Sequence, residues 1–282
     1  MSLSVFRRHS ERSEGPLHLG GVNVNQGRAI VEIGKAVASL YDTFARYPRP
    51  TMIEICPCGC TKPGATTHLV AVPLRELRFA DLADYSFSAM TTQGSLDEFR
   101  YLMPRLFQGV AEEPYSYNPE ILFGKLNYAK WMSWHEDEVA AVRTYLQALW
   151  QKGLTSFSIK DHLPAFFEEE TLLASIAQAG EALEPYLQIW TETRTEEADQ
   201  HLIQFVTMYG EEFSLGQTLH GAFWENSKSQ AEALRKWLLH PNTLQRVTNA
   251  ASLLRNDGFE HLFEPALKVL RSQSSSILER AS

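Results

Sequence analysis

The chain has 282 residues, of which 44% are hydrophobic and 21% charged, and its formal net charge is −8. These proportions are those of an ordinary globular protein with a substantial core, and no apolar run approaches the ~20 residues that span a bilayer. The acidic excess lies in residues 61–282, which hold 19 Lys and Arg against 29 Asp and Glu. Because such a surface repels phosphates, we expect a soluble, cytoplasmic protein that binds neither nucleic acid nor membranes.

The first part of the chain changes character near residue 26. Residues 1–25 mix Ser, Gly, Asn and charged residues without periodicity, which predicts a flexible N-terminal tail. Apolar residues then recur at three- and four-residue spacing through residues 27–47, the pattern of an amphipathic helix. Pro48 and Pro50 are expected to end this helix.

The only candidate strands lie near residues 51–74. They are the segments TMIEIC and HLVAVPL, and the chain between them is rich in turn residues. Two short strands can make at most one small β-hairpin, with the cysteines in its loop.

Helix signals dominate from residue 95 onward. Ser95 and Glu98 form a capping box, and Pro104 is expected to kink or break the helix that follows. Asn118 followed by Pro119 predicts the start of the next helix.

The same signals continue to the C-terminus. Ser133 and Glu136 form a second candidate capping box, and Gly153 is a candidate C-cap of the helix it opens. Six further helices are predicted at residues 166–180, 181–190, 195–210, 229–240, 242–258 and 259–272. The fold class is therefore mainly α, an irregular multi-helix bundle or a HEAT-like stack, with helical regions at 26–154 and 155–282 or one continuous domain over 26–282.

All three cysteines lie within five residues, and His68 follows them closely. Cys56, Cys58, Cys60 and His68 are the candidate ligands of a zinc ion. In an extended strand, residues two apart are about 6.6 Å apart and residues four apart about 13 Å. Two sulfurs on one zinc lie within about 4 Å of each other, so a straight strand cannot supply all three.

The residues between the cysteines are compatible with reduced thiols, with zinc binding and with a redox pair. Pro57 and Gly59 permit the backbone to curl into a Cys3His site, although C-x-C-x-C is not the C-x2-C spacing of established zinc knuckles. We favour three reduced thiols that pack as small hydrophobic side chains, with no cofactor. Zinc binding and a redox pair between Cys56 and Cys60 are the alternatives.

The sequence HEDE at residues 135–138 resembles part of a metalloprotease motif. The second histidine of H-E-x-x-H would stand at position 139, which is Val139. We therefore interpret the three carboxylates as first-turn residues that the helix dipole favours.

Three other histidines have structural interpretations. Glu197 with His201 and Asp257 with His261 are four residues apart on predicted helices, as in ordinary surface pairs. His220 lies in a stretch interrupted by glycines and is interpreted as part of a packed loop. Phosphate-loop, dinucleotide-binding and nucleophile-elbow motifs are absent from the sequence.

Residues 82–107 and 118–134 carry the aromatic and apolar sequences LADYSFSAMTTQGSLDEFRYLMPRLF and NPEILFGKLNYAKWMSW. Together with the preceding cysteine-bearing turn, they resemble a group of uncharacterised bacterial proteins over roughly residues 50–152. The resemblance implies a bacterial, cytosolic origin, and it implies no activity because no activity is established for that group.

The sequence favours a non-catalytic role. We expect a protein-binding module, for example a toxin-immunity or adaptor protein, whose acidic body suits a partner with a basic surface. The alternatives are a metal-binding protein or metal-dependent enzyme that uses the cysteine loop, and a structural helical subunit.

Overall fold

The computed structural model describes residues 24–114, 116–156, 168–215, 217, 219 and 221–255. Within these residues the chain forms ten α-helices: α1 (Val24–Phe44), α2 (Ala83–Ser88), α3 (Leu96–Glu112), α4 (Pro119–Tyr128), α5 (Glu136–Leu154), α6 (Glu169–Gln178), α7 (Glu184–Glu192), α8 (Glu196–Ser214), α9 (Lys228–Leu238) and α10 (Pro241–Arg255). Four short 3-10 helices connect them: η1 (Thr67–Val70), η2 (Leu74–Glu76), η3 (Phe79–Leu82) and η4 (Trp131–Ser133). The predicted all-α fold class is confirmed.

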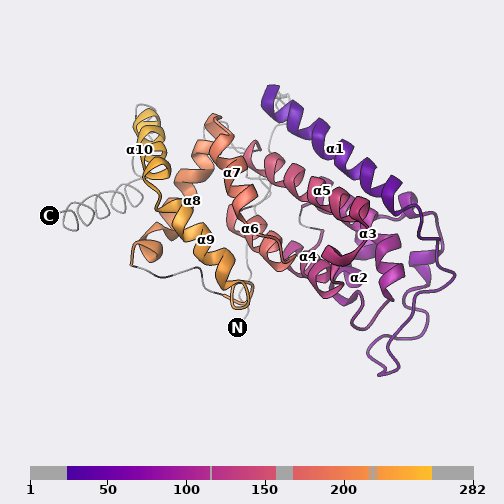
Figure 1. Ribbon diagram of the computed structural model, residues 1–282. Helices are drawn as coiled ribbons and strands as arrows, with labels where there is room; N and C mark the ends of the chain where they lie inside the picture. The colour runs from indigo at the N-terminus through magenta and orange to yellow at the C-terminus, as the bar shows by residue number, and fades with distance from the viewer. Residues whose placement is uncertain are drawn as a thin grey trace, which may run out of the picture.

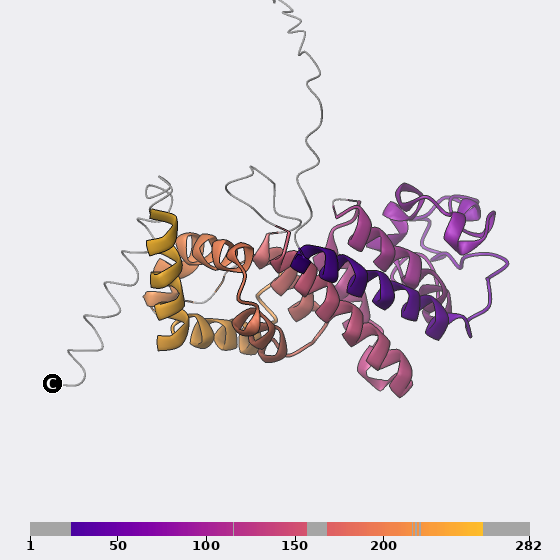
Figure 2. The ribbon, with the colours of Figure 1, turned by 90° about the horizontal axis from the view of Figure 1, so that it is seen from above.

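The helices pack in series along an elongated molecule (Figure 1, Figure 2). Helices α1 and α3 pack together at one end, with α5 alongside α1. Helix α5 contacts α6 and α7, and α8 contacts α9 and α10 at the other end. Because each group of helices covers the apolar face of the next, the buried hydrophobic residues form one cluster that runs from α1 to α10.

Three fully buried tryptophans bond to the backbone of a following segment, two of them across 48 and 36 residues of sequence and the third across 8. Their indole N–H groups donate to backbone carbonyl oxygens, Trp131 to Ala179 at 2.8 Å, Trp150 to Tyr186 at 2.8 Å and Trp190 to Ala198 at 3.0 Å. Each buried indole thus adds a large apolar surface to the core, and its single N–H donor has a hydrogen-bond acceptor. Each of these bonds fixes the position of one segment relative to the other.

Two predicted helix starts are confirmed. The Ser95 N–H donates to a Glu98 carboxylate oxygen at 2.7 Å, as in a capping box, and the Asn118 side chain accepts the Ile121 N–H at 2.7 Å. Pro104 lies inside α3 without breaking it, because the helix continues to Glu112.

Two other predicted caps are wrong. Helix α5 begins at Glu136, and the Ser133 hydroxyl donates to the carbonyl of Lys130 in η4, so Ser133 does not cap α5. Gly153 lies within the last turn of α5, where a Cβ atom would stand 2.7 Å from the Leu172 side chain. This glycine permits the close packing of α5 on α6.

The candidate hairpin does not form among the described residues. Thr67–Val70 is a 3-10 helix, and Ile55 makes an isolated antiparallel bridge to Gln93 instead of pairing with the 67–74 segment. In the 67–74 segment, local hydrogen bonds such as that from the Ala71 N–H to the His68 carbonyl use the backbone donors and acceptors. It therefore needs no neighbouring strand.

Several predictions concern residues outside the described ranges. These are residues 1–23 of the predicted tail, the helix at 259–272, the pair Asp257 and His261, and His220. Residues 24 and 25 were also predicted to belong to the flexible tail, which is wrong, because α1 begins at Val24.

Gly109 on α3 is expected to be intolerant of a side chain. A Cβ atom there would lie 2.5 Å from the ring of Tyr117, which is buried and donates its hydroxyl to the Phe79 carbonyl at 2.8 Å. We expect Gly109→Ala to lower the free energy of unfolding by about 1 to 3 kcal/mol, as overpacking does, measured by urea denaturation.

Gly124 on α4 provides the matched control for this substitution. It is also inside a helix, but a Cβ atom there would come no closer than 3.8 Å to Gln178. Alanine should therefore stabilise the protein by about 1 kcal/mol through helix propensity. Equal stability of the two alanine variants would contradict the predicted clash at Gly109.

Candidate functional site

The cysteines lie on an exposed loop, residues 51–66, at the end of the molecule remote from α10 (Figure 1, Figure 2). The stem of this loop is held by backbone hydrogen bonds to the link between α2 and α3. The Cys56 N–H donates to the Thr92 carbonyl at 2.9 Å, and the Gly94 N–H donates to the Glu54 carbonyl at 2.7 Å. The loop is therefore anchored immediately before its first cysteine.

Glu98 connects this stem to the start of α3. The residue is only 8% exposed. Its carboxylate accepts the backbone N–H of Ser95 at 2.7 Å and the backbone N–H of Glu54 at 3.2 Å. The first bond was predicted from the capping box, whereas the second joins residues 44 positions apart. One carboxylate thus caps α3 and fixes the base of the cysteine loop.

The loop brings two of the three sulfurs into contact. Gly59, with φ of +80°, allows the backbone to turn between Cys58 and Cys60, whose Sγ atoms lie 2.7 Å apart. The Cys58 N–H points to Cys56 Sγ at 3.3 Å, and the Cys60 N–H points to Cys58 Sγ at 3.4 Å. Cys58 and Cys60 are exposed, so the prediction that the thiols pack as small hydrophobic side chains does not describe this pair.

The three thiols differ in acidity because of these contacts. Hydrogen bonds from the thiols of Cys56 and Cys60, and from the Cys60 backbone, lower the pKa of Cys58 to about 7. The same contacts raise the pKa values of Cys56 and Cys60, because a thiol that donates to Cys58 holds its proton. At neutral pH, Cys58 is therefore the most readily ionised thiol of the group, and about half of it is thiolate.

The fourth candidate zinc ligand has a different partner. His68 lies on η1, and its Nε2 is 2.9 Å from the backbone carbonyl oxygen of Asp81. The 2.7 Å separation of the Cys58 and Cys60 sulfurs is shorter than the ~3.8 Å between two thiolates on a tetrahedral zinc. Zinc at Cys56, Cys58, Cys60 and His68 stays a prediction, and no group of three or more His, Cys, Asp or Glu that could hold a metal occurs in the described ranges.

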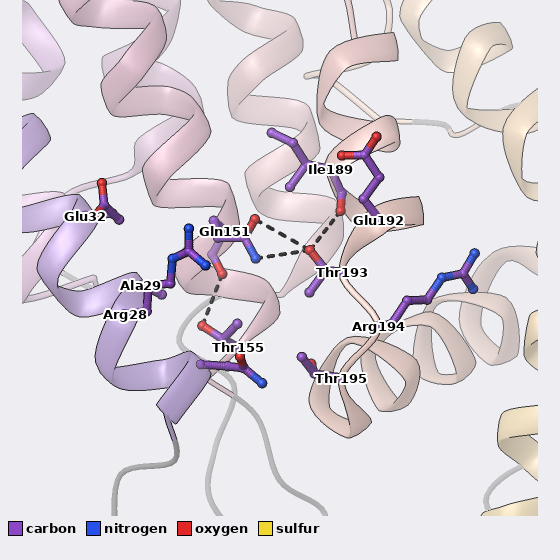
Figure 3. A pocket seen from close by; sticks show the side chains of 11 residues that line it. Arg28, Ala29, Glu32, Gln151, Thr155, Ile189, Glu192, Thr193, Arg194 and Thr195 are labelled. Atoms are coloured by element: carbon purple, nitrogen blue, oxygen red, sulfur yellow. Dashed lines mark hydrogen bonds between the residues drawn. The ribbon is translucent and has the colours of Figure 1, made fainter.

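A polar pocket of about 540 Å³ lies where the first turns of α1 meet the end of α5 and the link between α7 and α8 (Figure 3). Its polar groups are used by the fold: the Gln151 amide donates to the Thr193 hydroxyl at 3.0 Å, and that hydroxyl donates to the Ile189 carbonyl at 2.8 Å. Its charged side chains are balanced, two cations and two anions, namely Arg28, Arg194, Glu32 and Glu192. The pocket therefore carries neither excess charge nor a recognisable catalytic pair.

The predicted role of the HEDE segment in the first turn of α5 is confirmed. Asp137 forms an ion pair with Arg46, and the buried carboxylate of Glu138 accepts the Tyr47 hydroxyl at 2.6 Å. These carboxylates also join α5 to the chain that follows α1, a role that no local pattern could indicate.

His201 was predicted to be a surface residue, and this is wrong. The side chain is 1% exposed, and its Nδ1 contacts the carboxylate of Glu169 from α6. The i,i+4 spacing to Glu197 identified a neighbour on the same helix but not this partner, because α6 and α8 meet only in the tertiary structure.

In the part of the chain that the structure describes, no helix combines the length and the apolar character needed to cross a membrane. Comparison with known proteins places the chain in no group: no family model, no curated protein and no solved structure matches it.

Proposed function

We propose that the protein exchanges thiols and disulfides with a protein partner through Cys58 and Cys60. The observation that carries this proposal is the contact of two exposed sulfurs at 2.7 Å on a loop with an anchored stem. An attacking thiol is most effective when its pKa is near the ambient pH, and the pKa of Cys58 is about 7. Cys60 is adjacent as the second, resolving thiol.

The exchange balances with a disulfide as the co-reactant. The Cys58 thiolate attacks one sulfur of the partner disulfide, forms a mixed disulfide and releases the other sulfur as a thiolate, which takes a proton from water. Cys60 then loses its proton to water and attacks Cys58 Sγ, so that the bond to the partner breaks and the partner sulfur leaves as a thiolate, which takes a proton from water. The chain ends with a Cys58–Cys60 disulfide, and the partner disulfide has been reduced to two thiols.

The placement of the loop supports a macromolecular partner. Cys58 and Cys60 are exposed at one end of an elongated helical body, where a large substrate can approach without entering a cleft. The proposal retains the protein partner predicted from the sequence and replaces lasting association with a transient covalent one. The more specific roles, in toxin immunity or as an adaptor, stay predictions.

The pH dependence of alkylation tests the assignment of Cys58. The rate of its reaction with iodoacetamide, followed by peptide mass spectrometry, should reach half its maximum near pH 7, rather than near the ~8.5 of an ordinary thiol. The rate rises with pH because only the thiolate reacts. Cys56 and Cys60, whose pKa values are raised, should react more slowly at pH 7.

Oxidised glutathione tests the exchange itself. After incubation at pH 7, the wild-type protein should contain a Cys58–Cys60 disulfide and no bound glutathione, whereas Cys60→Ser should keep one glutathione on Cys58. Cys58→Ser should do neither. A wild-type protein that stays fully reduced, or an adduct of Cys60→Ser at Cys56, would contradict the assigned roles.

Metal analysis of the same preparations separates this proposal from zinc binding. If the purified protein contained stoichiometric zinc that was lost in both Cys58→Ser and His68→Ala, a Cys3His site would replace the exchange reaction. The protein should then also lose stability on chelation, because structural zinc contributes on the order of 10 kcal/mol.

A further inference from the structure

A basic pocket lies at the end of the molecule opposite the cysteine loop. It has a volume of about 420 Å³ and lies between α7, the C-terminal turn of α9 and the start of α10. Four basic side chains line it, Arg194, Lys236, His240 and Arg246, and no carboxylate does. We call this the basic pocket; its charge contrasts with the net charge of −8 for the chain.

Arg246 lines the basic pocket, but its guanidinium is already hydrogen-bonded within the protein. Its guanidinium donates to Asp199 and to two backbone carbonyl oxygens, each at 2.6 Å. Burial lowers its pKa, Asp199 opposes this effect, and the positive charge of Arg194 adds to the lowering. Arg194 is therefore close enough to repel Arg246, and Asp199 neutralises only one of the two guanidinium groups.

Two cations at the basic pocket lack full compensation. Within the described part of the chain, Arg194 makes no ion pair, although it also lines the polar pocket of Figure 3 together with Glu32 and Glu192. Lys236 lies 3.9 Å from Glu232, but that carboxylate also accepts two bonds from Arg235, at 2.8 and 2.9 Å. Glu232 therefore neutralises Lys236 only in part, so Lys236 and Arg194 leave a net positive charge for an external anion.

His240 adds an imidazole N–H donor to the basic pocket. Its Nδ1 accepts the backbone N–H of Asn242 at 3.3 Å, so Nε2 carries the proton of the neutral ring. The first amides of α10 are used within the protein, because the Thr243 N–H also bonds to the His240 carbonyl at 2.9 Å. The side chains, rather than the helix end, are what the basic pocket offers to a ligand.

We propose that the basic pocket binds a small phosphorylated molecule, with its phosphate held between Arg194 and Lys236. Guanidinium and ammonium groups are the usual protein partners of phosphate oxygens. Small-molecule sites commonly occupy about 300 to 1,000 Å³, so 420 Å³ accommodates the phosphate and a modest attached group. A long polyanion is disfavoured, because the chain as a whole carries a net charge of −8.

Titration calorimetry of the full chain with inorganic phosphate tests this inference. Phosphate should bind saturably to one site, and Arg194→Gln and Lys236→Gln should each weaken binding about ten-fold or more, as expected when a charged hydrogen bond is lost. Both side chains are exposed, so the variants should melt at the wild-type temperature.

Lys228→Gln is the matched control. Lys228 is an exposed lysine at the start of α9, it does not line the basic pocket, and its substitution removes the same charge. Binding by this variant should be unchanged. The inference is overturned if wild-type protein shows no saturable phosphate binding, if Lys228→Gln weakens it as much as Arg194→Gln, or if a single-stranded oligonucleotide binds more tightly than phosphate.

Discussion

Replacement of Arg246 with methionine is expected to lower the free energy of unfolding by about 3 to 5 kcal/mol. The residue is 7% exposed, and it donates to the Asp199 carboxylate and to the carbonyl oxygens of Trp190 and Thr193. Methionine matches much of the volume but donates nothing, so two backbone carbonyls around the buried guanidinium site lose their partner, as does the partly exposed carboxylate of Asp199. Urea denaturation at pH 7 measures the loss.

Arg235→Met is the control for this prediction. Arg235 makes two bonds to Glu232, at 2.8 and 2.9 Å, but the two side chains are 26% and 36% exposed. Ion pairs that water can reach contribute about 0 to 1 kcal/mol, so this variant should be nearly as stable as the wild type. If both substitutions cost the same, Arg246 does not hold the α7–α8 link in the way that its hydrogen bonds indicate.

Truncation of Trp190 to alanine should also destabilise the protein by about 3 to 5 kcal/mol. The side chain is fully buried, stacks on Trp237 with ring centroids 5.0 Å apart, and meets the edge of Trp150 at 5.3 Å. Its removal opens a cavity and leaves the Ala198 carbonyl without its indole donor. Thermal and urea denaturation should both report the loss.

Two further variants separate the causes of this loss. Trp190→Phe keeps an aromatic ring but removes the N–H group, so it should be of intermediate stability. Tyr128→Ala removes a large aromatic side chain that is 62% exposed, and should change stability by less than about 0.5 kcal/mol. A large loss in Tyr128→Ala would show that aromatic truncation in general, rather than the buried position of Trp190, sets the effect.

Arg246 and Trp190 also affect the basic pocket. Arg246 holds the carbonyl of Thr193, the residue before Arg194, and Trp190 stacks on Trp237, which follows Lys236. The two cations proposed to hold phosphate are therefore positioned by buried side chains, although they are themselves exposed. This arrangement explains why phosphate binding should be tested with variants of Arg194 and Lys236 rather than of the residues that support them.

The sequence by itself determined the features that depend on neighbours within one helical turn. The fold class follows from apolar spacing, and the starts of α3 and α4 follow from Ser95 with Glu98 and from Asn118 with Pro119. The bonded groups at these two starts, Ser95 with Glu98 and Asn118 with Ile121, are three residues apart, so the local chain alone brings them together.

Local patterns failed where a tertiary contact decided the outcome. Gly153 resembles a helix cap but is a packing contact with Leu172, and His201 resembles a surface residue but contacts Glu169. The apolar segment at 68–74 resembles a strand but has no neighbouring strand with which to pair. In the first two cases the deciding group comes from a distant part of the chain, whereas local 3-10 hydrogen bonds satisfy the third segment.

In the two candidate sites, too, the sequence determined some features and the tertiary structure determined others. The sequence identified the cysteine loop, since three thiols in five residues are visible without a structure. Only the fold decided that Cys58 contacts Cys60 and that Glu98 fixes the stem of the loop. The basic pocket was invisible in the sequence, because Arg194 and Lys236 are 42 positions apart and their cationic character is hidden within an acidic composition. Charges gather into a site only when packed helices bring them together, and that arrangement is determined by long-range packing rather than by local sequence.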